Sequence, residues 1–114
     1  MKKLLKMESA FLPEKIYKLK ESVVFAEGSV VSKIISKTKA GNVTLFAFDK
    51  DQFLSEHTAP FDAIVIVLDG VGQIIINKKD YELSAMEMII LPANVPHAVY
   101  GIEKFKMLLI MLKN

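Results

Sequence analysis

The chain of 114 residues contains no cysteine, no arginine and no tryptophan. Without cysteine, disulfides, thiolate nucleophiles and cysteine-ligated zinc sites are excluded. All fifteen basic residues are lysine, and the lack of a planar guanidinium fork disfavours bidentate recognition of phosphate or carboxylate. The formal net charge is only +2, so no strong electrostatic field is expected and nucleic acid is not an expected partner.

The sequence also lacks an apolar run of the roughly eighteen residues that a membrane-spanning helix needs. The first residues, MKKLLKMESAFLPEK, begin with lysines, but Lys6 and Glu8 interrupt the apolar residues. The uninterrupted apolar run of this segment is too short for the hydrophobic region of a signal peptide. No membrane partner is expected, and the sequence predicts a cytoplasmic protein.

Hydrophobic residues make up 52% of the chain, which is sufficient for the core of one domain of this length. Residues 1–28 differ from the rest because they are rich in lysine and have a weak helical pattern that Pro13 interrupts. We predict an N-terminal arm over residues 1–28, either a short helix or a strand that crosses to a neighbouring subunit. Residues 29–114 would form the single folded domain.

From Ser29 onward, runs rich in β-branched and aromatic residues are separated by short segments of turn residues. Gly41 and Asn42 are predicted to form a turn. Strands are predicted at 30–38, 43–48, 63–68, 73–76, 80–83, 88–91, 97–100 and 105–112. Short strands at this spacing, with no long helical pattern between them, predict an all-β sandwich or barrel.

Three predicted strands, AIVIVL, QIII and FKMLLIML, are apolar at nearly every position. Such strands are shielded from water on both faces. The interior of a barrel covers only one face, so the other needs a second sheet, the N-terminal arm or another subunit. Because a monomer rarely exposes so much apolar surface, we predict a homodimer.

The only two histidines, His57 and His97, lie in two segments that have the same character. Each histidine is close to a proline-bearing turn and next to a strand-like run, SEHTAPFDAIVIVLDG in one case and LPANVPHAVYG in the other. Two separate pieces of chain could therefore bring both imidazoles to one pocket.

At these residues the chain resembles the cupin family, whose two motifs are G-x5-H-x-H-x3 or 4-E-x6-G and P-x4-H-x3-N. The matching residues are His57 and Gly70 in the first motif and Pro92 and His97 in the second. The residues that differ are Asp51 for the opening glycine, Ala59 for the second histidine, Ala63 for the glutamate and Gly101 for the asparagine. The resemblance covers about residues 29–114 and implies a double-stranded β-helix, the jelly-roll barrel of the cupins.

In that barrel, alternation along the strands would direct one set of side chains from both segments to the interior. These residues are His57, Ala59, Ala63, Val65 and Val67 from the first segment and His97 and Val99 from the second. We predict an apolar pocket with a small polar end, in which His57, His97, Ala59, Ala63, Val65 and Val99 contact a small organic ligand. A histidine that only donates to a backbone carbonyl is the simpler alternative for His97.

Two of the four metal ligands that the resemblance implies are alanine, whereas catalytic metal sites usually have about three protein ligands. The cofactor prediction is therefore none, or a divalent metal held weakly by His57 and His97. A bulge near Pro60 could turn Asp62 inward as a third ligand.

Three functions stay open: a metal-free or weakly metal-binding ligand pocket, a metal-dependent cupin oxygenase or isomerase, and an assembly module with a vestigial pocket. The catalytic residues, and whether a reaction is catalysed at all, are not fixed by the sequence. We favour the ligand pocket.

Four methionines, Met86, Met88, Met107 and Met111, could line an adaptable pocket, although filling of the core is the favoured interpretation. The resemblance also places Met86 where the family commonly has glycine. This turn is therefore predicted to avoid the left-handed conformation that glycine tolerates.

Overall fold

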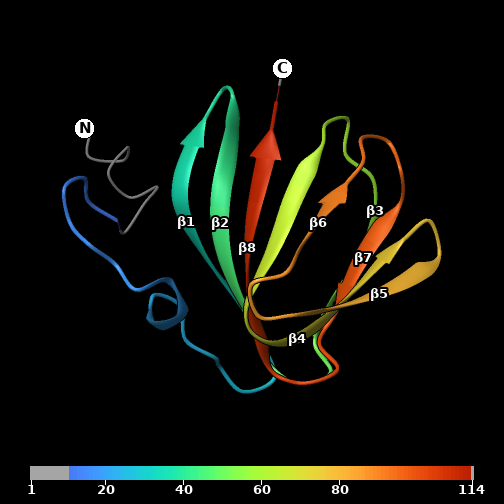
Figure 1. The fold of residues 1–114 in the computed structure, drawn as a ribbon, viewed down its shortest axis with the longest axis horizontal. Helices are drawn as coiled ribbons and strands as arrows, with labels where there is room; N and C mark the ends of the chain where they lie inside the picture. Colours follow the sequence, from blue (N-terminus) through green and yellow to red (C-terminus); the bar gives the residue numbers. More distant parts are fainter. Residues whose placement is uncertain (1–10, 114) are drawn as a thin grey trace.

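The computed structural model describes residues 11–113 and shows an all-β protein with one short 3-10 turn, η1 (Leu19–Glu21). The strands in this part of the chain are β1 (Val30–Thr38), β2 (Gly41–Phe48), β3 (Phe53–His57), β4 (Ala63–Ile76), β5 (Lys79–Ser84), β6 (Met88–Leu91), β7 (His97–Tyr100) and β8 (Phe105–Leu112) (Figure 1). The predicted fold class is confirmed. Four of the predicted strands, at 30–38, 88–91, 97–100 and 105–112, have the predicted bounds.

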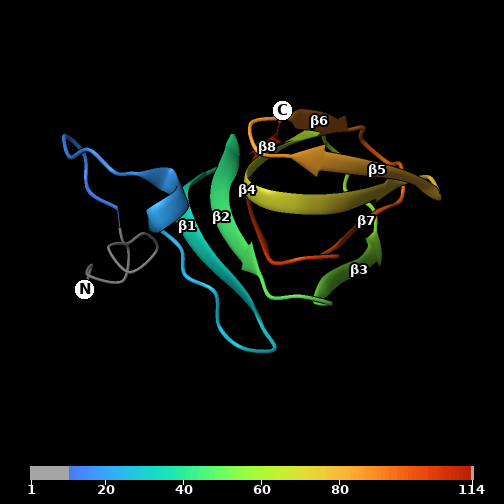
Figure 2. The ribbon, with the colours of Figure 1, turned by 60° about the horizontal axis from the view of Figure 1, so that its bottom comes forward.

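All strand pairs are antiparallel and β4 is the centre of the topology. The first half of β4 pairs with β8 on one side and β6 on the other, and β8 continues to β2 and β1. The second half pairs with β5 and β7, and β7 pairs with β3. Figure 2 shows these strands curling round a common interior, as a jelly-roll barrel requires.

β4 is one strand of 14 residues, not the two strands that the sequence predicted at 63–68 and 73–76. The Asp69–Gly70 dipeptide resembles a turn, but here it only bends the strand, and the register shifts between Val67 and Asp69. Gly70 has φ +77°, and a side chain there would collide with the backbone carbonyl of Lys104. Glycine therefore allows the strand to pass from one half of the barrel to the other without ending.

The turn predicted at Gly41–Asn42 is also wrong, since β2 already begins at Gly41 and the turn lies at Lys39–Ala40. Gly41 has φ +150° and lies opposite Leu112, where a side chain would collide with the backbone carbonyl of Met111. Glycine at this position serves a close approach of two strands and not a turn.

The prediction for Met86 is wrong as well, because its φ is +70°. Two contacts hold this left-handed turn: the Met86 N–H donates to the Val67 carbonyl at 2.7 Å, and the Ser84 N–H donates to Oε1 of Glu87 at 2.7 Å. The Met86 side chain is 77% exposed. The turn therefore keeps the glycine-type conformation without glycine, at a local cost of about 1 kcal/mol.

The interior of the barrel is filled at one end by large side chains and is less densely occupied at the other. Phe48 and Phe105 stack with their ring centroids 4.7 Å apart, and both are fully buried. Val67 and Ile74, also fully buried, belong to the same core cluster. This closed end gives the barrel a rigid floor.

The described part of the predicted N-terminal arm, residues 11–28, contains no strand and packs on the outside of the barrel (Figure 1). Val23 is fully buried there, in a cluster with Leu45 and Ala47 of β2 and Leu68 of β4. The chain's own N-terminal segment therefore supplies part of the outer cover. The prediction for residues 1–10 lies outside the described residues.

Beyond this cover, the outer face of β4, β6 and β8 carries exposed and half-buried apolar side chains that we call the outer patch. The outer patch consists of Ile64, Met88, Ile90, Ile110 and Leu112. The predicted homodimer would bury such a surface, and it stays a prediction. In residues 11–113 no helix is long and apolar enough to cross a membrane.

Candidate functional site

The two histidines are brought together by the pairing of β3 with β7. His57 lies opposite His97 in the register of these antiparallel strands. Their ring centroids are 4.4 Å apart, and the ring planes meet at 70° in an edge-to-face arrangement. The two segments that the sequence singled out therefore bring both imidazoles together, and a ligand site at this position stays a prediction.

Each imidazole is oriented by the backbone carbonyl of the residue two positions before it. Nδ1 of His57 lies 2.8 Å from the carbonyl oxygen of Ser55, and Nδ1 of His97 lies 3.1 Å from the carbonyl oxygen of Val95. Both contacts span two residues, so the same local geometry fixes both rings. The simpler alternative for His97, a hydrogen bond to a backbone carbonyl, is present together with its position at the site.

The two rings differ in their exposure to solvent. His97 is 7% exposed, whereas His57 is exposed. Burial lowers the pKa of His97 below its ordinary value of 6.5, and the nearby His57 adds to this effect, although the hydrogen bond to Val95 opposes it. His97 is therefore neutral at neutral pH, and the inner end of the site carries no positive charge from this ring.

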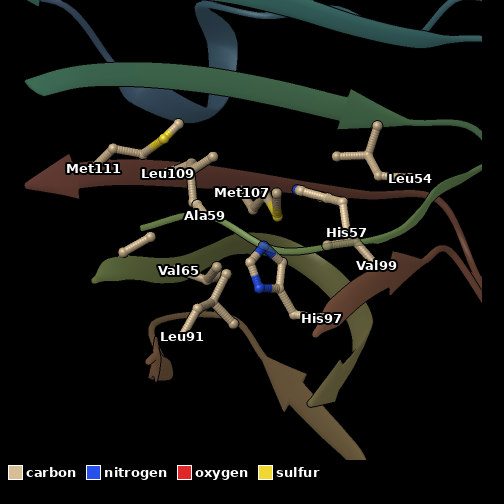
Figure 3. Close-up of a pocket in the computed structure, with 11 residues that line it drawn as sticks. Leu54, His57, Ala59, Val65, Leu91, His97, Val99, Met107, Leu109 and Met111 are labelled. Carbon is tan, nitrogen blue, oxygen red and sulfur yellow. The ribbon is translucent and has the colours of Figure 1, made fainter. Parts of the chain in front are cut away.

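A cavity of about 120 Å³ lies inside the barrel beside the two rings (Figure 3). Its walls include all six residues that the sequence predicted to contact a ligand: His57, His97, Ala59, Ala63, Val65 and Val99. Apart from the imidazoles, every side chain of the wall is aliphatic or a thioether. The structure thus brings the predicted residues to one apolar cavity, and ligand contact remains a prediction.

Five further residues line the wall, and of these only Met107 and Met111 were named from the sequence, as an alternative to filling of the core. The five residues are Leu54 of β3, Leu91 of β6, and Met107, Leu109 and Met111 of β8. The sequence of β8 gives no signal of which residues face inward, because it is apolar at nearly every position. Met107 and Met111 border the cavity, while Met86 and Met88 are 77% and 53% exposed, so core filling is not the role of the latter two.

The donor set does not fit the metal centre that the motif resemblance implies. In the described chain, residues 11–113, no group of three or more histidine, cysteine, aspartate or glutamate side chains could hold a metal ion. Asp62, the predicted third ligand, instead accepts a hydrogen bond from the Ala93 N–H at 2.8 Å, and Glu56 pairs with Lys78 at 3.7 Å. Two imidazoles alone fall short of about three protein ligands.

Two of the residues that depart from the family motif, Asp51 and Gly101, form backbone contacts that hold the barrel together. Asp51 adopts φ +67° where the family has glycine, and its N–H donates to the carbonyl of Gly101 at 2.7 Å. Its carboxylate accepts from the Tyr100 hydroxyl at 2.6 Å, which raises the pKa of Tyr100. Tyr100 does not line the cavity.

Comparison with known proteins places these features in a family. A family model described as a cupin domain matches residues 44–112. No curated protein matches the chain. A conserved protein of unknown function from Streptococcus pyogenes is 31% identical, with a TM-score of 0.87 and 91% of each chain covered.

Two further solved structures support the same assignment. A cupin 2 conserved barrel domain protein from Leptotrichia buccalis is 42% identical, with a TM-score of 0.83 over 85% of this chain and 47% of the other. A cupin superfamily protein from Desulfitobacterium hafniense is 26% identical, with a TM-score of 0.84 over 89% and 93% of the two chains. With both histidine-bearing segments inside the matched region, the chain belongs to the cupin family.

Proposed function

We propose that this cupin binds a small organic molecule inside the barrel, with His57 and His97 as the polar end of the site, and that it does so without a tightly held metal. The observation that carries the proposal is the apolar cavity of about 120 Å³ that has two imidazoles in its wall. Cavities with few, well-placed polar groups are the usual form of small-molecule sites.

The alanines at two of the four motif departures support this function. Ala59 and Ala63 border the cavity at the places where the motif resemblance implies a histidine and a glutamate. Their methyl groups leave room that longer side chains would fill. Because they also remove two potential ligands, the same replacement that weakens a metal site enlarges a site for an organic molecule.

The methionines offer a direct test by NMR of protein labelled with 13C in the methionine methyl groups. A small library of compounds with about six to eight non-hydrogen atoms, the size expected to fit such a cavity, would be titrated into the protein. Binding should shift the signals of Met107 and Met111, which border the cavity, while Met86 and Met88 on the exterior serve as internal controls. A library in which no compound moves the two cavity signals would contradict the proposal.

The metal-free part of the proposal has its own measurement. Elemental mass spectrometry of protein purified without a histidine tag should show far less than one metal ion per chain. A near-stoichiometric transition metal that disappears in the His57→Ala, His97→Ala double variant would contradict the metal-free site and favour a metal-dependent enzyme.

A further inference from the structure

The tautomer of each neutral imidazole follows from its backbone contact. Nδ1 of His57 and Nδ1 of His97 each lie within hydrogen-bond distance of a carbonyl oxygen, at 2.8 and 3.1 Å. A carbonyl oxygen can only accept, so each Nδ1 must carry the proton. In a neutral imidazole the other nitrogen, Nε2, then has a lone pair and no hydrogen.

The position of His97 favours the neutral form of its ring. His97 is 7% exposed, and the ring centroids are 4.4 Å apart. Two imidazolium ions at this separation would repel each other, and a charge on His97 would be poorly solvated. Figure 3 shows a nitrogen of each ring directed toward the interior of the site. When both rings are neutral, the site therefore presents two hydrogen-bond acceptors.

The remaining wall provides no donor that could serve an acceptor on the ligand. It consists of leucine, alanine, valine and methionine side chains, none of which carries an O–H or N–H group. A carboxylate, ketone or ether would lose its hydrogen bonds to water on entry and find none in return, which is costly in an apolar cavity. A ligand that donates avoids this cost.

The size of the cavity sets the second criterion. Its volume is about 120 Å³, and an engineered apolar cavity of about 150 Å³ in another protein binds benzene. A single six-membered ring is therefore close to the upper limit of what the closed cavity holds, although the exposed His57 marks a side on which a larger ligand could extend.

We propose that the cavity selects neutral, ring-sized molecules that bear a hydroxyl group, which donates a hydrogen bond to Nε2 of His57 or His97. This inference rests on the proposed function and specifies its ligand class. Acceptor-only and anionic molecules of the same size are rejected, because the acceptors of the site face the acceptors of the ligand.

Three probes of similar size test this selection: phenol, which donates; toluene, which has a methyl group in place of the hydroxyl; and pyridine, which only accepts. At about pH 8 free histidine side chains and all three probes are neutral. Phenol should bind about tenfold more tightly than either of the others, measured by the Met107 and Met111 methyl shifts. A purely apolar cavity would prefer toluene, because toluene is the more hydrophobic of the two.

The outcomes separate this inference from the proposed function. Toluene or pyridine binding as tightly as phenol, with the cavity methionines shifted, overturns the donor requirement and leaves small-molecule binding intact. Absence of phenol binding also overturns the donor requirement, whereas small-molecule binding fails only when the wider library gives no shift at Met107 and Met111.

A double variant and a spectrum of the imidazoles provide independent readouts. In the double variant His57→Phe, His97→Phe, an aromatic ring remains at each position but its hydrogen-bond acceptor is lost. The preference for phenol over toluene should therefore disappear. Long-range 1H–15N spectra of the unaltered protein should show the Nδ1–H tautomer at both histidines. The Nε2–H tautomer at both rings would overturn the inference without any ligand measurement.

Discussion

The two faces of β4 are both apolar, yet they have different roles. In the first half of the strand the inward side chains are Ala63, Val65 and Val67, and the outward side chains are Ile64, Ile66 and Leu68. The small inner side chains leave a cavity, whereas the larger outer ones provide surface for packing. A strand without polar alternation thus shows that both faces avoid water, and the size of the side chains indicates which face borders empty space.

The outer face is itself divided into a covered and an uncovered part. Val23 of the N-terminal segment contacts the cluster formed by Leu45, Ala47 and Leu68. The outer patch beyond it stays accessible, with Met88, Ile90 and Leu112 each at least 50% exposed. The apolar outer face is therefore covered by the chain's own N-terminal segment at one end and is exposed to solvent at the other.

The largest effect should come from breaking the covered part. Val23 is fully buried, and Val24 beside it is 67% exposed. Val23→Asp would place an unpaired carboxylate in an apolar cluster, and we expect a loss of about 3 kcal/mol or more in the free energy of unfolding. Val24→Asp should change it by less than about 0.5 kcal/mol. Equal losses of the free energy of unfolding in the two variants, measured by urea denaturation, would show that burial of Val23 does not stabilise the barrel.

The inner face can be tested by filling the cavity. Ala63→Leu introduces a larger side chain into the wall beside Leu91 and Met111. We expect ligand affinity, measured by titration calorimetry, to fall by about tenfold or more, while overpacking costs about 1–3 kcal/mol of stability. The matched control is Ala98→Leu on the outside of β7. Unchanged affinity in Ala63→Leu would place the ligand elsewhere.

The uncovered part of the outer face bears on the predicted homodimer. We propose that a second copy of the chain covers the outer patch, because a monomer rarely exposes an apolar surface of this kind. Ile90→Lys should then convert a dimer to a monomer in multi-angle light scattering at micromolar concentration, with little change in monomer stability. Leu12→Lys, at a residue that is 64% exposed and outside the outer patch, serves as control. A monomeric mass for the unaltered protein would contradict the proposed homodimer.

The smallest effect concerns the one buried titratable group of the inner wall. The native pKa of His97 is lowered from 6.5, so below that pH the unfolded chain takes up a proton at this residue that the native protein resists. The free energy of unfolding should therefore decrease as the pH falls from 6.5 toward the lower native pKa, and then level off for this residue. His97→Gln should reduce this slope in denaturation curves at pH 7 and pH 5. An unchanged slope would mean that other groups cause the pH dependence.

Much of the fold follows from local signals in the sequence, and the failures have local causes. Alternation and turn residues predicted most strands from Val30 to Leu112 but missed β3 (Phe53–His57). Glycine, in addition, marks several different structures. At Gly70 it bends a continuous strand, and at Gly41 it permits a close cross-strand approach. Only the partner strand distinguishes these cases from a turn, and partners are not visible in local sequence.

The candidate site was predictable where motif spacing fixed the positions and not elsewhere. His57 and His97 carry the spacing, and alternation placed Ala63 and Val65 beside them. The contribution of β8 was not favoured, because Met107 and Met111 belong to a strand that is apolar at nearly every position. The inward side of such a strand depends on the register with β4. The orientation of the imidazoles by the Ser55 and Val95 carbonyls also required the folded backbone.

The central position of β4 and the peripheral position of β3 have a consequence for how a ligand would enter and leave. β4 is hydrogen-bonded to four strands, so its amides should exchange with solvent only when the whole barrel unfolds. Among residues 11–113, β3 pairs with β7 alone, and its register is irregular between Leu54 and His57. Local detachment of β3 is therefore expected to be much more frequent than unfolding. It would carry His57 away and open the cavity from that side, so that the residence time of a ligand is set by one edge strand and not by the stability of the barrel.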